Sequence, residues 1–259
     1  MNFGLLRERV SALFGVVILV KNWPTYLLDH FSLIKKPFLT YRLRNGIDYK
    51  VRVGPNITDR ELIGEIIVLG AYNPEGFEIQ QKDTVLDIGA NIGIFSVMAS
   101  KRTTGGIVYA FEPFEENFRM LQENATLNKA GNIVPCQMAV SGKTGRGKLS
   151  VSSNTACHSF YGKNGEKKVV VETISLDDFV KRKKISSIEF LKMDCEGSEY
   201  DILFNCSGDT LKKIKKISME YHKIDNKRYD GRRLKSFLEK KGFEVNMLES
   251  RCRLYAKRL

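Results

Sequence analysis

The sequence predicts an α/β fold in which a mostly parallel sheet carries helices on both faces. From residue 83 onward, short apolar segments typical of buried strands alternate with segments typical of helices. The last two predicted strands, 243–248 and 253–257, are separated only by Glu249, Ser250 and Arg251, give or take a residue or two. A parallel connection needs roughly a dozen residues or more, so these strands must form an antiparallel hairpin at one end of the sheet.

The individual elements follow from apolar periodicity and from turn residues. Residues 1–37 are expected to be helical with a break at Pro24. Residues 38–54 alternate around Asn45-Gly46, which predicts a hairpin, and residues 58–72 predict a helix. Strands of the main sheet are expected at residues 84–88, 107–112, 133–140, 188–193, 214–221, 243–248 and 253–257. Helices are expected at residues 94–102, 115–128, 176–183, 198–205 and 232–241.

Residues 141–173 interrupt this alternation. The segments GRGKLSV and KKVVVETI flank SSNTACHSFYGKNGE and predict an inserted hairpin that reaches over the ends of the parallel strands. We therefore expect an N-terminal helical and β-hairpin extension, residues 1–57, followed by one α/β domain, residues 58–259.

The charge balance alone does not identify a partner. The chain has 42 Lys and Arg against 30 Asp and Glu, a net charge of +12, which would suit nucleic acid, an anionic membrane or a phosphorylated substrate. However, basic runs are more often solvated helix faces. The five cysteines include no C-x-x-C pair, which argues against a disulfide framework and a structural zinc site. A reducing compartment fits best, and we expect a cytoplasmic protein.

The apolar segment VSALFGVVILV, residues 10–20, resembles part of a signal peptide but lacks a small-residue cleavage site. It is also shorter than the roughly 20 residues that span a bilayer. Two interpretations remain: a helix packed on the domain, or an interfacial helix with Trp23 and Tyr26 at the lipid headgroups. The second would give peripheral membrane contact.

The turn DIGANIG, residues 87–93, lies between the first parallel strand and its helix. Ligands of such sheets bind beyond the carboxyl ends of the strands, where Asp87 could accept a hydrogen bond and glycines allow close approach. Glu112, at the end of the second strand, is well placed to accept from both hydroxyls of a ribose. The turn does not match G-x-G-x-x-G, which lowers the odds of a nicotinamide dinucleotide. The alternative is a tight corner without a ligand.

Five segments in order are similar to the FkbM family of S-adenosylmethionine-dependent methyltransferases: DTVLDIGANIGIFS, AFEPFEENFRMLQENATLN, TISLDDF, LKMDCEGSEYDIL and MEYH. The resemblance covers about residues 60–245. It implies a Rossmann-like methyltransferase fold whose sheet ends in an antiparallel strand. It also implies methyl transfer from S-adenosylmethionine, commonly to hydroxyl groups of sugars, glycolipids or polyketide-like products. We therefore expect a small-molecule or glycan acceptor and no nucleic acid.

The resemblance also assigns the cofactor site. It implies that Glu112 binds the ribose with Pro113 beside it, and that Met138 and Ala139 flank the adenine. The remaining residues that it places at the cofactor are Asp87, Gly89, Asn91, Gly93 and Asp194.

Two predicted strand ends bring acidic residues together for catalysis. The first, KMDCEGSE, holds Asp194, Glu196 and Glu199; the second, MEYH, holds Glu220 and His222. Glu196 and Glu199 are expected either to cap a helix or to bind the acceptor. Imidazole has an unperturbed pKa of about 6.5, so we expect His222 to take the acceptor's proton, with Glu220 orienting it and Asp194 as a further catalytic candidate. His158, in the inserted hairpin, is expected to contact the acceptor, and no metal is predicted.

Three rival functions remain open. A nicotinamide-dependent oxidoreductase is disfavoured by the altered glycine pattern and by the terminal hairpin. Nucleic-acid amino-methyltransferases usually carry N/D-P-P-Y/F where this chain has MDCEG. A non-enzymatic basic module that binds membrane or RNA would not need the glycine turn, Glu112 and the acidic cluster together.

Overall fold

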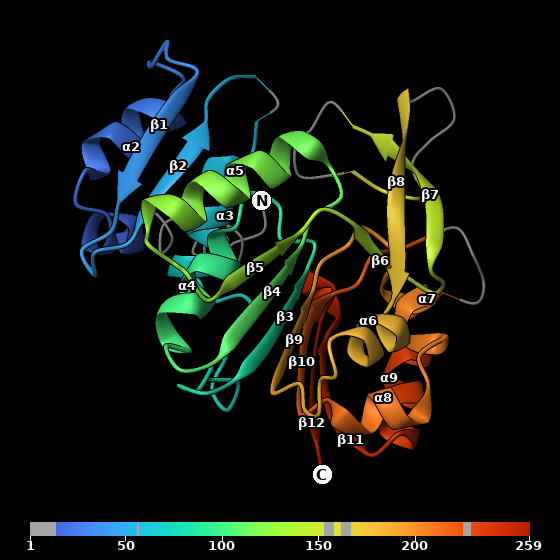
Figure 1. Ribbon diagram of the computed structural model, residues 1–259. Helices are drawn as coiled ribbons and strands as arrows, with labels where there is room; N and C mark the ends of the chain where they lie inside the picture. Colours follow the sequence, from blue (N-terminus) through green and yellow to red (C-terminus); the bar gives the residue numbers. More distant parts are fainter. Residues whose placement is uncertain (1–13, 56, 153–157, 162–166, 225–228) are drawn as a thin grey trace.

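A computed structural model describes residues 14–259 except 56, 153–157, 162–166 and 225–228. Its centre is a seven-stranded sheet in the order β11-β12-β10-β9-β3-β4-β5 (Figure 1). The five strands from β10 to β5 in this order are mutually parallel, and β12 and β11 form an antiparallel hairpin. The strands are β3 (Thr84–Ile88), β4 (Ile107–Phe111), β5 (Ile133–Cys136), β9 (Phe190–Met193), β10 (Lys216–Glu220), β11 (Phe243–Leu248) and β12 (Arg253–Arg258). The predicted mostly parallel sheet with a terminal antiparallel hairpin is confirmed.

The later strand of that hairpin takes the inner position. β12 pairs with both β10 and β11, so the chain makes the edge strand first and the inner strand second. Burial explains this choice: four consecutive residues of β12, 253–256, are buried, whereas β11 alternates between buried or half-buried and exposed positions. A strand flanked on both sides suits the more buried segment.

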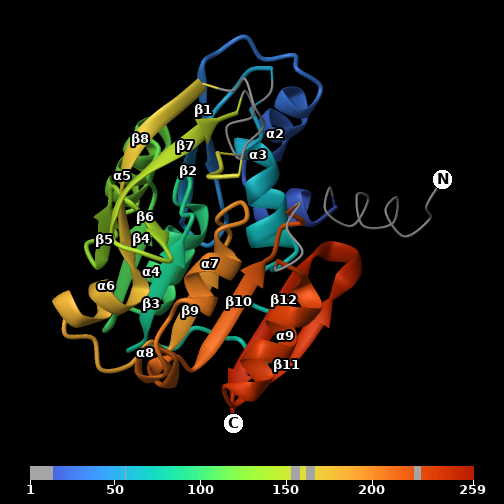
Figure 2. The same ribbon diagram turned by 90° about the vertical axis from the view of Figure 1, so that its right-hand side faces the viewer.

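Helices cover both faces of the sheet and create two cores. Successive residues of a strand point to opposite faces, and Val85 of β3 belongs to one core while Leu86 belongs to the other. The first core contains α4 (Ile94–Arg102) and α5 (Glu115–Leu127). The second contains α6 (Leu176–Arg182), α7 (Glu199–Phe204), α8 (Gly208–Lys213) and α9 (Gly231–Lys240), as Figure 2 shows from the side.

Within residues 58–259, the structure differs from the predicted elements chiefly at three places. The expected strand 133–140 is split into β5 and β6 (Ala139–Ser141), because β6 leaves the main sheet to pair with the inserted hairpin. The expected helix 58–72 is a short α3 (Asp59–Leu62) that continues as a π-helix, Ile63–Val68. Helix α8 was not predicted, because no element was assigned between the expected helix 198–205 and strand 214–221; its N-cap is Ser207, which accepts the N–H of Thr210.

The inserted hairpin is present as predicted. Strands β7 (Gly145–Val151) and β8 (Lys167–Ser175) pair antiparallel, and β6 joins β8 in parallel to complete a second sheet. This sheet stands above the carboxyl ends of the parallel strands (Figure 1).

The N-terminal extension packs on α5. Residues 14–19 and α2 (Trp23–His30) are helical, whereas residues 31–37 are not, and residues 1–13 lie outside the described part. Strands β1 (Phe38–Arg42) and β2 (Asp48–Arg52) form the predicted hairpin, and β2 binds Asn124 and Asn128 of α5. Tyr26 is buried in the same core as α4 and α5, so it does not lie at the surface as the interfacial interpretation required. The division at residue 57 stays a prediction.

In the part of the chain that the structure describes, every helix falls short of the length and apolar character that crossing a bilayer requires.

Candidate active site

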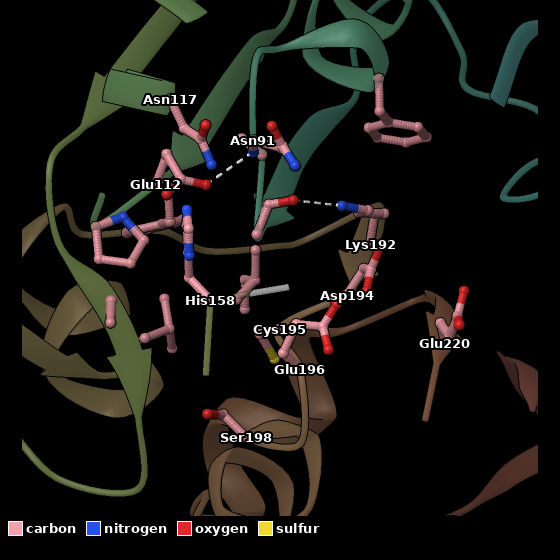
Figure 3. A pocket seen from close by; sticks show the side chains of 18 of the residues that line it. Asn91, Glu112, Asn117, His158, Lys192, Asp194, Cys195, Glu196, Ser198 and Glu220 are labelled. Carbon is pink, nitrogen blue, oxygen red and sulfur yellow. Dashed lines mark hydrogen bonds between the residues drawn. The ribbon is translucent and has the colours of Figure 1, made fainter. Parts of the chain in front are cut away.

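A cavity opens at the carboxyl ends of β3, β4, β9 and β10, under the inserted sheet (Figure 3). Nine of the predicted site residues line it: Gly89, Asn91, Glu112, Pro113, Ala139, His158, Asp194, Glu196 and Glu220. Five others do not line it: Asp87, Gly93, Met138, Glu199 and His222. Each of these five has another place in the structure, described below.

The glycines of the turn are required mainly by close packing. Gly89 has a φ of 77°, and a Cβ there would lie 1.8 Å from the carbonyl oxygen of Asp194. Gly93 has a φ of 86°, and a Cβ there would lie 2.5 Å from Leu121 of α5. Gly89 therefore lets β9 approach the turn and also borders the cavity, whereas Gly93 serves the contact between α4 and α5.

Asp87 lies beneath the turn rather than in the cavity. Its side chain is completely buried; Oδ2 accepts from Ser96 Oγ at 2.6 Å, and Oδ1 lies 3.1 Å from Lys192 Nζ. Lys192 Nζ also donates to the carbonyl oxygen of Gly89 at 2.7 Å. Burial opposes its charge, but the charges of Asp87 and Asp194 outweigh burial and raise the pKa of Lys192. Asp87 thus holds the turn through Lys192, and its side chain does not line the cavity.

Glu112 closes the end of β4 and points into the cavity. Its Oε2 accepts the N–H of Asn91 at 2.9 Å and its Oε1 accepts the N–H of Phe114 at 2.8 Å. Burial raises the pKa of Glu112 to about 7, although both backbone N–H groups act in the opposite direction. Each oxygen retains a lone pair for a further donor, as a pair of ribose hydroxyls would supply.

His158 lies at the Glu112 side of the cavity, not at the acidic strand ends (Figure 3). Its ring centroid is 4.1 Å from that of Phe114, and Nδ1 accepts the N–H of Ser152 at 3.2 Å. Burial lowers the pKa of His158 to about 4, so the neutral ring carries its proton on Nε2. That buried Nε2 has no partner in the described structure, which leaves a donor for a ligand.

These residues fit an adenosyl group. Glu112 has lone pairs that hydroxyls can donate to, and the buried Nε2 of His158 and Oδ1 of Asn91 have no hydrogen-bond partner in the described structure. Buried polar atoms without partners are costly unless a ligand satisfies them. Ala139, the first residue of β6, borders the same region, whereas Met138 packs into the second core.

Asp194 and Glu220 occupy the other side of the cavity. Asp194 follows β9, and its Oδ2 accepts from Tyr72 Oη at 2.8 Å. Glu220 ends β10 and is 29% exposed. Burial, with the neighbouring charge of Asp194, raises the pKa of Glu220 to about 7. A carboxyl group with a pKa near neutrality is suited to general-base catalysis.

Carboxylates lie close to both ring nitrogens of His222. Nδ1 lies 3.0 Å from Glu199 Oε1, and Nε2 lies 3.5 Å from Glu196, 3.9 Å from Asp194 and 3.9 Å from Glu220. Burial would lower the pKa of His222, but the hydrogen bond to Glu199 and the surrounding charges raise it to about 10. The ring is therefore an imidazolium at neutral pH. The expectation that it acts as the base rested on an unperturbed pKa, which this environment removes.

Glu199 supports this arrangement from below. It is completely buried, and its Oε1 also accepts the N–H of Cys195 at 3.0 Å. It therefore shapes the β9–α7 turn and orients His222, and it does not face an acceptor as expected.

Ligand atoms of Asp194, Glu196 and His222 lie within 4.8 Å of one another, close enough to surround a metal ion. A metal would require a neutral His222, whereas its surroundings favour the protonated ring. The prediction of a metal-free site stays a prediction.

Several site residues were not foreseen from the sequence. Lys192 is a lysine within the buried strand FLKM, and that position was the signal available. Tyr72 and Glu65 come from the segment after the N-terminal hairpin, and Glu65 pairs with Arg253 of β12. No motif joins these segments, because only the fold brings them together.

Comparisons with known proteins identify the family. Residues 87–245 match the methyltransferase FkbM domain, more than half of the chain. The chain is 26% identical over 196 residues to 31-O-demethyl-FK506 methyltransferase FkbM of Streptomyces tacrolimicus. The aligned residues cover 63% of this chain and 75% of that protein. It is also 26% identical over 145 residues to hexuronic acid methyltransferase AglP of Haloferax volcanii. Those aligned residues cover 56% of this chain and 58% of AglP, which is under two thirds of the length of AglP.

Among solved structures, a SAM-dependent methyltransferase from Agrobacterium tumefaciens aligns with a TM-score of 0.47 and 11% identity, over 87% of this chain and 71% of that one. The domain match, which includes the glycine turn, Glu112 and both acidic strand ends, establishes the assignment. This chain belongs to the FkbM family of methyltransferases.

Proposed function

We propose that this methyltransferase transfers its methyl group to a hydroxyl of a glycan or another small molecule. The family uses S-adenosylmethionine as the methyl donor. One relative is named for 31-O-demethyl-FK506 and the other for a hexuronic acid, and both names support an oxygen acceptor. The observation that carries the proposal is Glu220, a carboxyl group with a pKa of about 7 in the same cavity as Glu112.

The cavity divides into two ends with different chemistry (Figure 3). Glu112, Asn91 and His158 would hold the adenosyl part, and Asp194 and Glu220 would face the acceptor. When bound, S-adenosylmethionine supplies an electrophilic methyl group on a sulfonium. The protein's contribution is then to position the acceptor oxygen in line and to remove its proton.

Glu220 is the proposed base. Its ionised form accepts the proton of the acceptor hydroxyl, which leaves the oxygen electron pair free to form the new carbon–oxygen bond. The His222 imidazolium, 3.9 Å from Glu220, limits repulsion among the carboxylates and keeps Glu220 ionisable near neutrality. Asp194, fixed by Tyr72, would accept a second hydroxyl of a polyol acceptor.

Two measurements test this function. Calorimetric titration with S-adenosylmethionine, S-adenosylhomocysteine and NAD should show binding of the two sulfur ligands and none of NAD. Incubation with labelled S-adenosylmethionine and a panel of uronic acids, neutral sugars and macrolide alcohols should then give an acid- and base-stable methyl ether. Cofactor binding without transfer to any hydroxyl, together with transfer to an amine or to a carboxylate as a base-labile methyl ester, would overturn the hydroxyl acceptor but leave the cofactor assignment intact.

A further inference from the structure

Large apolar side chains are exposed at high density near the start of the described chain. Among the described residues, seven of the thirteen exposed large apolar side chains lie within residues 14–38. Phe14, Phe31 and Leu33 are 69%, 67% and 66% exposed. The set, named here the N-terminal patch, consists of Phe14, Ile18, Leu19, Leu28, Phe31, Leu33 and Phe38. Such a concentration marks an interaction surface rather than the scattered apolar residues of an ordinary surface.

Within residues 14–47 the exposed charges have one sign, although Glu123 of α5, which pairs with Lys50 over the ring of Phe38, adds a carboxylate beside the patch. Residues 14–47 contain five basic residues, all exposed: Lys21, Lys35, Lys36, Arg42 and Arg44. Asp29 is the single acidic residue in this range, and it is buried against Tyr41 and Arg60. The surface therefore combines apolar and cationic groups and presents no exposed carboxylate between residues 14 and 47.

The fold brings these two kinds of group together. The backbone N–H and the Nε of Arg44 donate to the carbonyl oxygens of Leu19 and Ile18, each at 2.8 Å. The N–H of Lys21 donates to the carbonyl oxygen of Arg42 at 2.7 Å. The rest of the patch lies at the other end of α2, a helix about 12 Å long, and α2 lies beside the β1–β2 hairpin in both Figure 1 and Figure 2.

We propose that the N-terminal patch docks on a membrane surface that carries anionic lipids. Apolar side chains of this kind enter the boundary between headgroups and acyl chains, while surrounding Lys and Arg bind lipid phosphates. A second copy of the chain fits less well, because a two-fold contact would place the same five basic residues against each other. Docking of this kind needs no membrane-spanning helix. It is independent of the reaction that the enzyme catalyses.

Vesicle flotation of the full chain tests the proposal. Binding is expected to vesicles that contain phosphatidylglycerol, to weaken as NaCl rises, and to be far lower with phosphatidylcholine alone. The double variant Phe31→Ser/Leu33→Ser should weaken binding about tenfold or more, because two apolar side chains no longer leave water. The charge reversal Lys35→Glu/Lys36→Glu should weaken it by a similar factor.

The chain offers matched controls on β8. Val170 is 64% exposed, and Lys167 and Lys168 are adjacent exposed lysines. Val170→Ser and Lys167→Glu/Lys168→Glu should therefore leave vesicle binding unchanged, and thermal unfolding should show that all variants fold. The proposal is overturned if the full chain binds neither vesicle, if the β8 variants lose as much binding as the patch variants, or if sedimentation shows a dimer of the full chain that Phe31→Ser/Leu33→Ser dissociates.

Discussion

Oε1 of Glu199 lies 3.0 Å from Nδ1 of His222, and the same oxygen accepts the backbone N–H of Cys195. A completely buried carboxylate thus fixes both a turn and a charged imidazole. The charge on His222 acts on Glu196, Asp194 and Glu220. The contact between Glu199 and His222 therefore influences the protonation of all three carboxyl groups.

The first prediction concerns that contact directly. Replacing Glu199 with Gln keeps an acceptor for Cys195 but removes the buried charge, so the pKa of His222 should fall from about 10 by roughly one to three pH units. NMR titration of the imidazole ring measures this. The exposed Glu172→Gln is the control and should not move it. An unchanged His222 titration in Glu199→Gln would show that the other carboxylates hold the proton.

The proposed base gives the second prediction. Glu220→Gln should lower kcat by about 10²- to 10⁴-fold while S-adenosylmethionine affinity stays within about twofold, since general-base catalysis is worth that much. In the wild type, the pKa of about 7 means that kcat should rise with pH through neutrality as the carboxylate forms. Steady-state kinetics from pH 6 to 9 measures both, with the exposed Glu244→Gln as the control. Retained turnover in Glu220→Gln would assign proton removal to another group.

The third prediction concerns the ribose carboxylate. Glu112→Gln should weaken S-adenosylmethionine binding about tenfold or more, because a charged acceptor is lost and the amide N–H₂ faces a backbone N–H. Since the pKa of Glu112 is raised to about 7, wild-type affinity should increase from pH 6 to pH 8 as the carboxylate ionises. Calorimetry at three pH values measures the trend, which Glu112→Gln should lack. The neighbouring exposed Glu115→Gln should behave like the wild type.

Close packing at the glycine turn gives the fourth prediction. Gly89→Ala places a methyl group on the carbonyl oxygen of Asp194 and should both destabilise the fold and abolish cofactor binding. Gly76 has a similar φ, 83°, but no atom within 4 Å of its added Cβ. Gly76→Ala therefore should cost only about 1–2 kcal/mol of left-handed backbone strain. Thermal unfolding and calorimetry compare the two; equal losses would mean that strain, not the clash, dominates at Gly89.

The fifth prediction concerns metal dependence. Because His222 is protonated among its carboxylates, a divalent ion would have to displace that proton before binding. Methyl transfer should therefore persist after EDTA treatment and dialysis, and added Mg²⁺ or Mn²⁺ should not increase it. Loss of turnover in EDTA with recovery on adding Mg²⁺ would instead assign Asp194, Glu196 and His222 to a metal.

The sequence predicted best where local chemistry is strong. β3 and α4 were predicted to the residue, because an apolar run, a glycine turn and an apolar helix follow one another without ambiguity. Glu112 lies in the cavity as the sequence predicted. The carboxyl ends of parallel strands meet at one edge of the sheet, so a residue that follows a strand can be placed at that edge from the sequence alone. Periodicity also located the inserted hairpin.

The sequence predicted the surroundings of a side chain least well where its partner lies far along the chain. Asp87 was expected to face a ligand, but its neighbour across the sheet is Lys192, which no local pattern reveals. The pKa of His222 depends on Glu199, whose burial follows from how α7 packs. His158 was assigned to the acceptor, whereas the path of the inserted sheet places it beside Glu112.

The inner position of β12 constrains the order in which the enzyme is built. β11 is synthesised before β12, yet among the strands that the structure describes its only sheet partner is β12. The ribosome must therefore release β12 before β11 can join the sheet. β12 also carries Arg253, which pairs with Glu65 at the cavity, and Tyr255, which binds the carbonyl oxygen of Ala71. A nascent chain that stops short of β12 therefore lacks the partner of Glu65, a residue that lines the cavity, and the strand that joins β11 to the sheet.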